Sequence, residues 1–315
     1  MNFMTEHPPE YAMPEHVTSE HIILPDGRRL SYRRYGAVDG APVIALHGTP
    51  GFGLKFGFAA KAAADKGMTL ICPDRWGYGQ TQAPARVART LADFAIDLEA
   101  LVDAVGCGRR VGLLAISGGG PFAVATAARL GDRVSSLGLV APVGPIVCMP
   151  QTGERTIAAM TPFHHFCFRL LPRVPGAVEA LFAVFGVVAR KAPDLAMKIV
   201  TVRAASSDRK LMLDEAERRG QAQVFGGGLA AGALGPAIDM RIFSQRWDIA
   251  FGDVVAKTQI WQGSADRNVP VSAAERLARE ISHADYTPID NAGHCWIAQN
   301  ADLVMDWFAK NDARC

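Results

Sequence analysis

A serine, an aspartate and a histidine stand in three short loops and together could carry out nucleophilic catalysis. Ser117 lies in the stretch Ala-Ile-Ser-Gly-Gly, Asp266 ends Gly-Ser-Ala-Asp, and His294 ends Asn-Ala-Gly-His. A serine hydroxyl is a weak nucleophile until a base within hydrogen-bond reach takes its proton, and that base needs a carboxylate to orient it. These residue types therefore predict Ser117 as the nucleophile, His294 as the base and Asp266 as the orienting acid.

The serine stands where a predicted strand meets a predicted helix. The apolar run 111–116 predicts the strand, and the small-residue stretch 120–130 predicts the helix. Ala115 and Gly119 flank Ser117 two positions to either side, and a sharp strand-to-helix turn needs small residues there. Such a turn exposes the hydroxyl and points free N–H groups of the helix start at the site. The alternative is a glycine-rich turn that only begins a helix.

A second loop, with the sequence His-Gly-Thr-Pro-Gly, follows the predicted strand 43–47. A carbonyl attacked by serine becomes an oxyanion, which needs hydrogen-bond donors fixed in advance. The backbone N–H groups of Thr49 and Gly118 are the candidates for this oxyanion hole. We expect His47 itself to be a structural residue of the loop.

Two further patterns compete with this interpretation. Asp290 is a rival acid, but it stands only four residues before the histidine and is expected to cap the loop, so Asp266 is favoured. Gly51-Phe-Gly, followed by Asp74 after the next predicted strand, imitates a dinucleotide-binding fingerprint. The third glycine of that motif would be position 56, which is Phe56, and this disfavours a nucleotide site.

Alternating strands and helices must position these loops. A hairpin is expected from residues 17–24 and 28–35 around Asp-Gly. The predicted strands after it are 43–47, 69–73, 111–116, 136–140, 258–262 and 284–289. The predicted helices between and after them are 54–66, 90–105, 120–130, 271–282 and 296–309. Such alternation predicts an α/β protein with a mostly parallel sheet covered by helices on both faces.

The alternation stops between about 144 and 255, where no strand is evident. Helices are expected there at about 153–171, 177–191, 194–205, 208–222 and 233–246. We therefore predict a core domain made of residues 1–142 and 256–315, and a helical cap inserted as residues 143–255. Apolar side chains of the insertion, Phe182, Phe185 and Phe225 among them, could line an acyl-sized pocket or form the core of the cap.

Composition narrows the functional classes. Hydrophobic residues make up 49% of the 315-residue chain, charged residues 20%, and the formal net charge is +2. This balance describes a globular protein without the basic surface that nucleic acid requires. The most apolar stretch, 177–189, is shorter than the about 20 residues of a membrane span. The six cysteines form no CxxC pair, and residues 1–17 lack an apolar leader, so a cytoplasmic location is expected.

The combined motifs resemble those of the α/β-hydrolases over almost the whole chain. The resemblance rests on the His-Gly-Thr-Pro-Gly loop, Pro-Asp-Arg-Trp-Gly-Tyr-Gly at 73–79, the turn around Ser117, the Asp266 loop with Val269-Pro270, and Gly293-His294. It implies an eight-stranded, mostly parallel sheet with a helical cap after the sixth strand. It also implies the catalytic triad Ser117, Asp266 and His294, in the chain order typical of that fold.

The same resemblance narrows the expected activity. Haloalkane dehalogenases and epoxide hydrolases of this fold use an aspartate where this chain has Ser117, so those activities are disfavoured. The prediction is a carboxylesterase- or lactonase-like hydrolase of a small, largely apolar substrate, with no metal or organic cofactor. Hydrolysis of a C–C bond, and a weakly catalytic sensor of small ligands, remain the alternatives. No nucleic acid or membrane partner is expected, and the sequence leaves a homodimer open.

Overall fold

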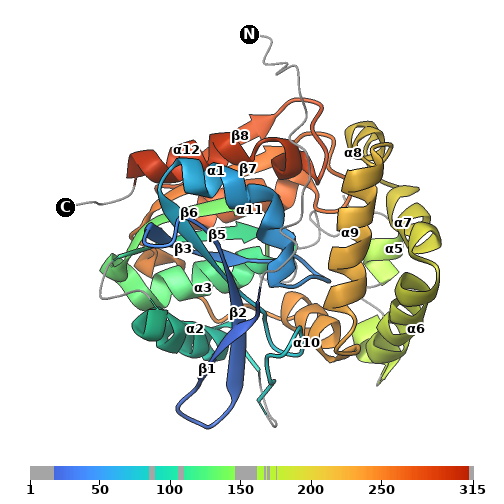
Figure 1. Ribbon diagram of the computed structural model, residues 1–315, viewed down its shortest axis with the longest axis horizontal. Coiled ribbons are helices and arrows are strands. Elements are labelled where there is room, and N and C mark those ends of the chain that lie inside the picture. Colours follow the sequence, from blue (N-terminus) through green and yellow to red (C-terminus); the bar gives the residue numbers. More distant parts are fainter. Residues whose placement is uncertain are drawn as a thin grey trace.

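The chain folds around one eight-stranded sheet, described by a computed structural model for residues 18–84, 89–105, 110–145, 162–166, 168, 171–174 and 176–311. The strands are β1 (Glu20–Ile23), β2 (Arg29–Gly36), β3 (Ala41–Leu46), β4 (Met68–Pro73), β5 (Val111–Ile116), β6 (Val134–Val140), β7 (Lys257–Gly263) and β8 (Asp285–Ile289). Figure 1 shows the sheet, which runs through the middle of the molecule, and the spatial order of its strands is β1-β2-β4-β3-β5-β6-β7-β8.

Pairing in the sheet follows the prediction of a hairpin and then a parallel array. The β1–β2 and β2–β4 pairs are antiparallel, and the remaining five pairs are parallel. The hairpin turns at Gly27, whose φ of 84° suits glycine. The predicted α/β fold with a mostly parallel sheet is confirmed.

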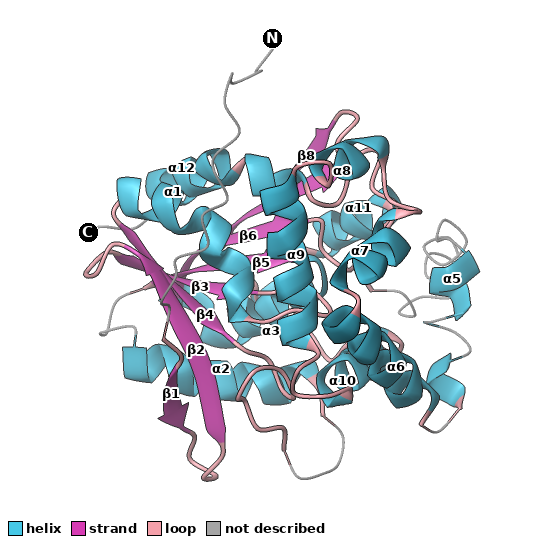
Figure 2. Ribbon diagram, turned by 45° about the vertical axis from the view of Figure 1, so that its right-hand side comes forward, coloured by secondary structure: helices cyan, strands magenta, loops and turns pink. Residues whose placement is uncertain are grey.

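Helices cover both faces of the sheet (Figure 2). They are α1 (Ala60–Asp65), α2 (Leu91–Val105), α3 (Gly120–Leu130), α11 (Val271–Glu280) and α12 (Ala301–Asn311). Short 3₁₀ segments η1 (Gly53–Ala59) and η7 (Trp296–Gln299) precede α1 and α12, so the two single helices expected at 54–66 and 296–309 are each divided.

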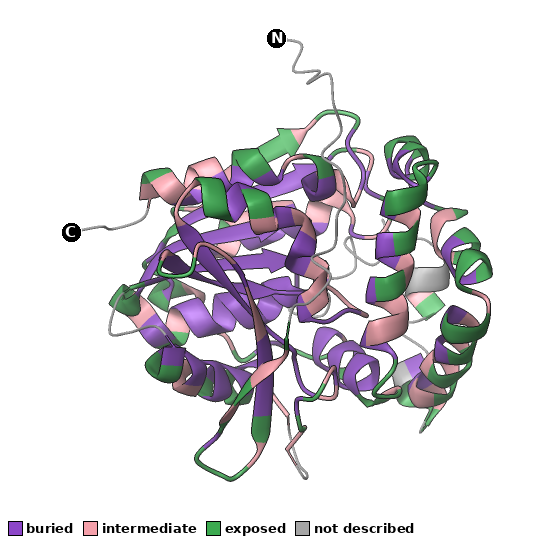
Figure 3. Ribbon diagram, viewed as in Figure 1, coloured by how far each residue is buried: buried purple, intermediate pink, exposed green. Residues whose placement is uncertain are grey.

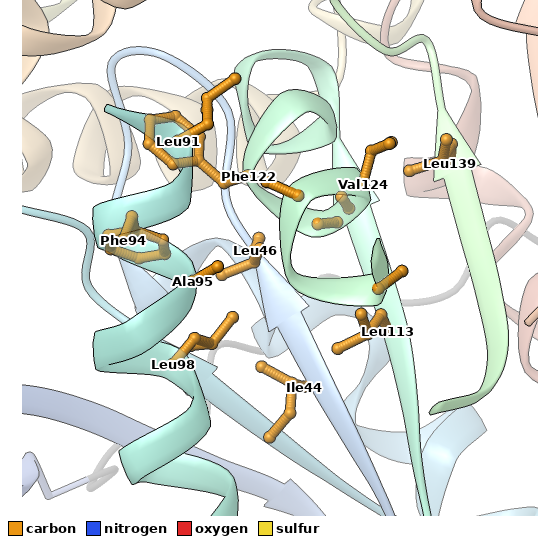
Figure 4. Close-up of a cluster of buried hydrophobic side chains, with 14 of the residues drawn as sticks. Ile44, Leu46, Leu91, Phe94, Ala95, Leu98, Leu113, Phe122, Val124 and Leu139 are labelled. Carbon is orange, nitrogen blue, oxygen red and sulfur yellow. The ribbon is translucent and has the colours of Figure 1, made fainter. Parts of the chain in front are cut away.

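Alternate side chains of the central strands enter two separate cores, as the period of a strand requires. Ile44 and Leu46 of β3 pack with α2 and α3, where Phe94 and Phe122 also lie (Figure 4). Val43 and its neighbours on the other face pack with α1 and α12. The central strands β3, β5 and β6 are buried over their whole length (Figure 3).

A helical insertion separates β6 from β7. Its described helices are α5 (Pro162–His165), α6 (Ala177–Lys191), α7 (Pro193–Thr201), α8 (Ser206–Leu211), α9 (Glu215–Gly228) and α10 (Leu234–Phe243), with η5 (Leu171–Arg173) and η6 (Phe251–Asp253). Most of the helix expected at 153–171 lies outside the described residues. Within the described part of the chain, no helix is both long and apolar enough to cross a membrane.

The single helix expected at 208–222 is wrong, because the structure contains two helices there. Asp214 stands between α8 and α9, and its side chain accepts a hydrogen bond of 3.0 Å from the backbone N–H of Glu217. This Asp-x-x-Glu pattern is a helix-start signal that is present in the sequence. Helix α9 then continues to Gly228, beyond its expected end.

The last glycines of α9 allow the helix to pack closely on the sheet domain. A Cβ on Gly227 would collide with the ring of Phe52, and one on Gly228 would lie 2.8 Å from the backbone nitrogen of Gly51. Helix α9 therefore lies against the loop after β3 on one side and against α7 on the other (Figure 1).

Two glycines in the central strands make room for one aromatic ring of α12. A Cβ on Gly112 of β5 would lie 3.0 Å from the ring of Phe308, and one on Gly138 of β6 would lie 2.8 Å from it. Phe308 is 1% exposed, whereas Leu303 on the same helix is 49% exposed. The ring thus fills a space that these strands leave open.

We predict that Phe308→Ala lowers the free energy of unfolding by about 3–5 kcal/mol, because the closely packed sheet cannot collapse into the cavity. Leu303→Ala, on the exposed face of the same helix, should change it by less than about 0.5 kcal/mol. Urea unfolding followed by circular dichroism measures both values. Equal losses for the two variants would contradict this description of the core.

Candidate active site

The predicted functional loops meet at one edge of the sheet. Strands β3, β5, β7 and β8 run parallel, so the loops that follow their carboxyl ends come together there. This is the edge at which open parallel sheets bind ligands. Ser117 follows β5 directly, Thr49 follows β3, Asp266 follows β7, and His294 follows β8.

Ser117 occupies a sharp turn between β5 and α3. Its φ is 53°, which non-glycine residues rarely adopt. A Cβ on Gly119 would collide with the carbonyl oxygen of Leu46, and one on Gly120 would lie 2.8 Å from Pro142. The glycines after the serine therefore let α3 begin in contact with both neighbouring strand ends.

Asp266 and His294 form a hydrogen-bonded pair. The Nδ1 atom of His294 lies 2.8 Å from Oδ2 of Asp266, which also accepts a bond of 3.0 Å from the Gln262 side chain. The other carboxylate oxygen accepts the backbone N–H groups of Asn268 and Val269 at 2.7 and 3.0 Å. The carboxylate is thus fixed on both sides. The structure brings Asp266 to the histidine, whereas the rival Asp290 is exposed.

The pKa values of this pair move in opposite directions. Burial disfavours the charged imidazole of His294, but the Asp266 carboxylate more than offsets this and raises the pKa of His294 above 6.5. Burial likewise disfavours the carboxylate of Asp266, yet the histidine and the two backbone N–H groups hold its pKa below 3.8. Near neutral pH, Asp266 is therefore ionised and can orient the imidazole.

The loop after β3 lies directly against the serine turn. A Cβ on Gly48 would come within 3.3 Å of the Ser117 Cβ, and one on Gly118 would collide with the Thr49 hydroxyl. The two candidate oxyanion-hole residues, Thr49 and Gly118, are therefore adjacent. Buried His47 holds the base of the loop, because its Nδ1 lies 2.8 Å from the Gly48 carbonyl oxygen and its Nε2 accepts the backbone N–H of Arg75 at 3.1 Å.

A buried carboxylate from the insertion fixes the same loop. Oδ2 of Asp239, on α10, accepts the Thr49 hydroxyl at 2.6 Å, the Tyr78 hydroxyl at 2.7 Å and the Arg75 guanidinium at 2.5 Å. Arg75 also donates to the His47 backbone carbonyl. The sequence does not reveal this cluster, since Asp239 lies 164 positions from Arg75.

A second carboxylate of the insertion holds the histidine loop. Asp208, on α8, accepts the backbone N–H of His294 and that of Cys295, each at 2.9 Å. It is 4% exposed, and a Cβ on Gly293 would collide with its carboxylate. Gly293 thus gives the carboxylate access to the amides that precede η7. No local sequence signal pointed to Asp208.

Ser117 and His294 line one cavity of about 100 Å³ between the sheet edge and the insertion. Its apolar wall comes from α7, α9 and the segment between α8 and α9. The residues of this wall include Met197, Val200, Met212, Val224 and Phe225. Among the phenylalanines proposed from the sequence, Phe225 lines the cavity, whereas Phe182 packs against the core.

Polar residues that sequence reasoning missed also line this cavity. Lys55 of η1 donates a hydrogen bond of 2.9 Å to Oε1 of Gln221 on α9. A lone lysine within the apolar stretch after the Gly51 loop is the one signal that could have singled it out. Cys295, beside His294, also lines the cavity, and burial raises the pKa of its thiol to about 12. It therefore stays protonated at neutral pH and is a poor rival to Ser117 as nucleophile.

Comparisons with known proteins agree with this architecture. Residues 41–165 match the family model of the alpha/beta hydrolase fold. The chain is 31% identical over 174 residues to Lipase 1 of Psychrobacter immobilis, covering 51% of this chain and 54% of that protein. It is 28% identical over 131 residues to a non-heme chloroperoxidase of Streptomyces lividans, covering 42% of this chain and 47% of that protein. The chain thus spans about half the length of these curated relatives.

A solved structure extends the likeness to nearly the whole chain. An epoxide hydrolase from Vigna radiata superposes with a TM-score of 0.70 at 17% identity, covering 95% of this chain and 98% of that one. An identity this low shows the fold alone. The fold, its helical insertion and the matched family model together show that this chain has the α/β-hydrolase fold.

Proposed function

We propose that this protein is a serine hydrolase that cleaves a carboxylic ester or lactone of a small, largely apolar substrate through an acyl-enzyme. The observation that supports this most is that His294, which is paired with Asp266, lines the same cavity as Ser117 in its strained turn. The activity of Lipase 1 agrees with ester cleavage. The other relatives differ in activity, so the residues of the site must decide.

In the proposed reaction, His294 takes the proton of Ser117 as the hydroxyl attacks the substrate carbonyl. The tetrahedral oxyanion accepts hydrogen bonds from the backbone N–H groups of Thr49 and Gly118, which lie side by side. The imidazolium then protonates the leaving alcohol, and the same histidine activates water to hydrolyse the acyl-enzyme. Asp266 stabilises the imidazolium without taking its proton.

The nucleophile type separates this proposal from the chemistry of some structural neighbours. The epoxide hydrolases and haloalkane dehalogenases of this fold have aspartate as nucleophile, which forms an alkyl ester with substrate. Ser117 stands at that position here. The serine oxygen attacks an acyl carbon, and the carbonyl oxygen then becomes an oxyanion that the two adjacent amides can stabilise.

We further propose that residues 143–255 act as a cap over a core formed by 1–142 and 256–315. The insertion contributes the apolar wall of the cavity and two carboxylates that hold active-site loops. Asp239 holds the Thr49 loop, and Asp208 holds the backbone of His294. The cap would therefore position catalytic groups as well as enclose substrate.

Ser117→Ala should reduce the hydrolysis of nitrophenyl esters on the order of 10⁴–10⁶-fold, because no other nucleophile replaces the hydroxyl. A fluorophosphonate probe should label the wild type at Ser117 and leave the variant unlabelled, as mass spectrometry of the peptides will show. Ser282→Ala, which changes an exposed serine, serves as the control. Full turnover by Ser117→Ala would exclude the proposed nucleophile.

Asp266→Asn should lower kcat/KM on the order of 10³–10⁴-fold, because the imidazole loses its orienting charge. The base acts in its neutral form, so kcat/KM rises with pH through the pKa of His294. Since Asp266 raises that pKa, the rising limb of the wild type should lie above 6.5 and should move to lower pH in the variant. A pH–rate profile with an unmoved limb would contradict the pairing.

Asp208→Ala should lower kcat/KM about 10- to 100-fold, because the His294 backbone loses its carboxylate acceptor and the imidazole is less well placed. Asp208→Asn, which keeps one acceptor oxygen, should have a smaller effect. The rate of fluorophosphonate labelling should fall in parallel, while the circular dichroism spectrum stays native. Lys210→Ala, on the exposed face of the same short helix, is the control. An unchanged labelling rate would limit Asp208 to a structural role.

A further inference from the structure

Two side chains that line the proposed catalytic cavity, Lys55 and Gln221, have N–H groups that the described residues do not pair with an acceptor. The Lys55 ammonium has three N–H groups, and the structure pairs it with one acceptor, Oε1 of Gln221, at 2.9 Å. Gln221 is only 3% exposed, and its Nε2 atom has no hydrogen-bond partner among the residues that the structure describes. Both residues line the cavity that contains Ser117 and His294. Buried polar groups are normally satisfied, so these donors point to a missing acceptor.

The charge around Lys55 favours an anionic acceptor. No carboxylate of the described residues lies within ion-pair distance of it, although the carboxyl groups of Asp208 and Glu217 act on it from farther away. Asp208 is engaged by two backbone N–H groups. Burial raises the pKa of Glu217 to about 7, so about half of it is neutral at pH 7. A partly buried lysine without a carboxylate partner is costly, and a bound anion would offset that cost.

The dimensions of the subsite limit the kind of anion. Lys55 belongs to η1 and Gln221 to α9, two elements in direct contact, and the rest of the wall is largely apolar. A cavity of about 100 Å³ accommodates a short chain with a compact head group. One planar carboxylate can accept from an ammonium and an amide N–H together.

We propose that Lys55 and Gln221 form a carboxylate-binding subsite, so that the preferred substrates are short monoesters of dicarboxylic acids. The ester would lie at Ser117, the apolar chain along Met212 and Val224, and the free carboxylate between the Lys55 ammonium and the Gln221 amide. This inference rests on the proposed hydrolase function and names its substrate class.

Matched ester pairs test the selectivity. Monomethyl adipate and methyl hexanoate share one carbon chain and differ in a terminal carboxylate against a methyl group. In a series from monomethyl succinate to monomethyl suberate, at least one half-ester should exceed its neutral partner in kcat/KM, measured as methanol release. Lys55→Met and Gln221→Glu should each reduce that ratio about 10- to 100-fold, the second by placing a negative charge against the substrate.

Control variants and a neutral substrate make the assignment specific. Lys61→Met removes an exposed lysine of the adjacent α1 and should keep the wild-type ratio. In a further ester of the same chain length, a methyl ketone replaces the terminal carboxylate, so that a neutral hydrogen-bond acceptor stands where the anion was. Equal preference for the ketone and the half-ester would overturn the assignment to an anion. A wild-type ratio near one at every chain length would also overturn it, as would a ratio that Lys55→Met leaves unchanged.

Binding measured without turnover separates the subsite from the hydrolase. In the Ser117→Ala background, calorimetry should show the dicarboxylate of the preferred chain length binding more tightly than the matched monocarboxylate, and Lys55→Met should abolish the difference. If all esters are inert but this preference is present, the proposed hydrolysis fails and the subsite stands. If neutral esters are cleaved and dicarboxylates show no preference, the subsite fails and the hydrolase stands.

Discussion

The backbone turn at Ser117 is the constraint on which the remainder of the site depends. A φ of 53° for a residue with a side chain costs about 1–3 kcal/mol, so the surrounding structure must enforce it. Strand β5 is central and paired on both sides, which fixes where the turn begins. The glycines that follow let α3 start in contact with the carbonyl of Leu46 and with Pro142. The serine is thereby held above the sheet edge, beside the loop after β3.

The insertion is coupled to the sheet at the two loops that matter for the proposed chemistry. Asp239 of α10 reaches Thr49 and the buried Arg75, while Asp208 of α8 reaches the amides of His294 and Cys295. Each carboxylate is buried and is satisfied by donors from the sheet domain. Rigid displacement of the insertion would leave these charges unpaired. Separation would therefore carry an energetic cost at the sheet edge where Thr49 and His294 lie.

The same contact surface contains a cation, Lys55, that has no carboxylate within ion-pair distance among the described residues. Arg75 has the carboxylate of Asp239 within 2.5 Å, whereas Lys55 has an amide oxygen at 2.9 Å and the Phe58 ring at 6.0 Å. The two basic residues thus differ in their partners, and they also differ in whether they line the cavity. Arg75 is 1% exposed and lies outside the cavity lining, whereas Lys55 faces the cavity. An internal ion pair suits a structural anchor, and a cation without a carboxylate partner suits a position that an anionic ligand completes.

Local sequence was sufficient for the features that depend on local chain geometry. Small residues around Ser117 indicated the turn, the apolar runs indicated the strands, and the loops with Asp266 and His294 followed from where strands end. Even the missed division of the 208–222 segment had a local signal in Asp214-Glu-Ala-Glu217. The choice of Asp266 over Asp290 was also favoured from the sequence, and the 2.8 Å contact with His294 agrees with it.

Only the tertiary structure decided which distant side chains complete the site. Asp208 lies 86 positions from His294, and Gln221 lies 166 positions from Lys55. Nothing in the spacing along the chain encodes such pairs, because they arise when the insertion folds back over the sheet edge. The sequence by itself determined the fold, the three loops and the residue types that could react. The packing of α8, α9 and α10 decided what holds those loops and which chemical group the cavity is suited to receive, because buried charges and donors acquire partners only when separate elements come into contact.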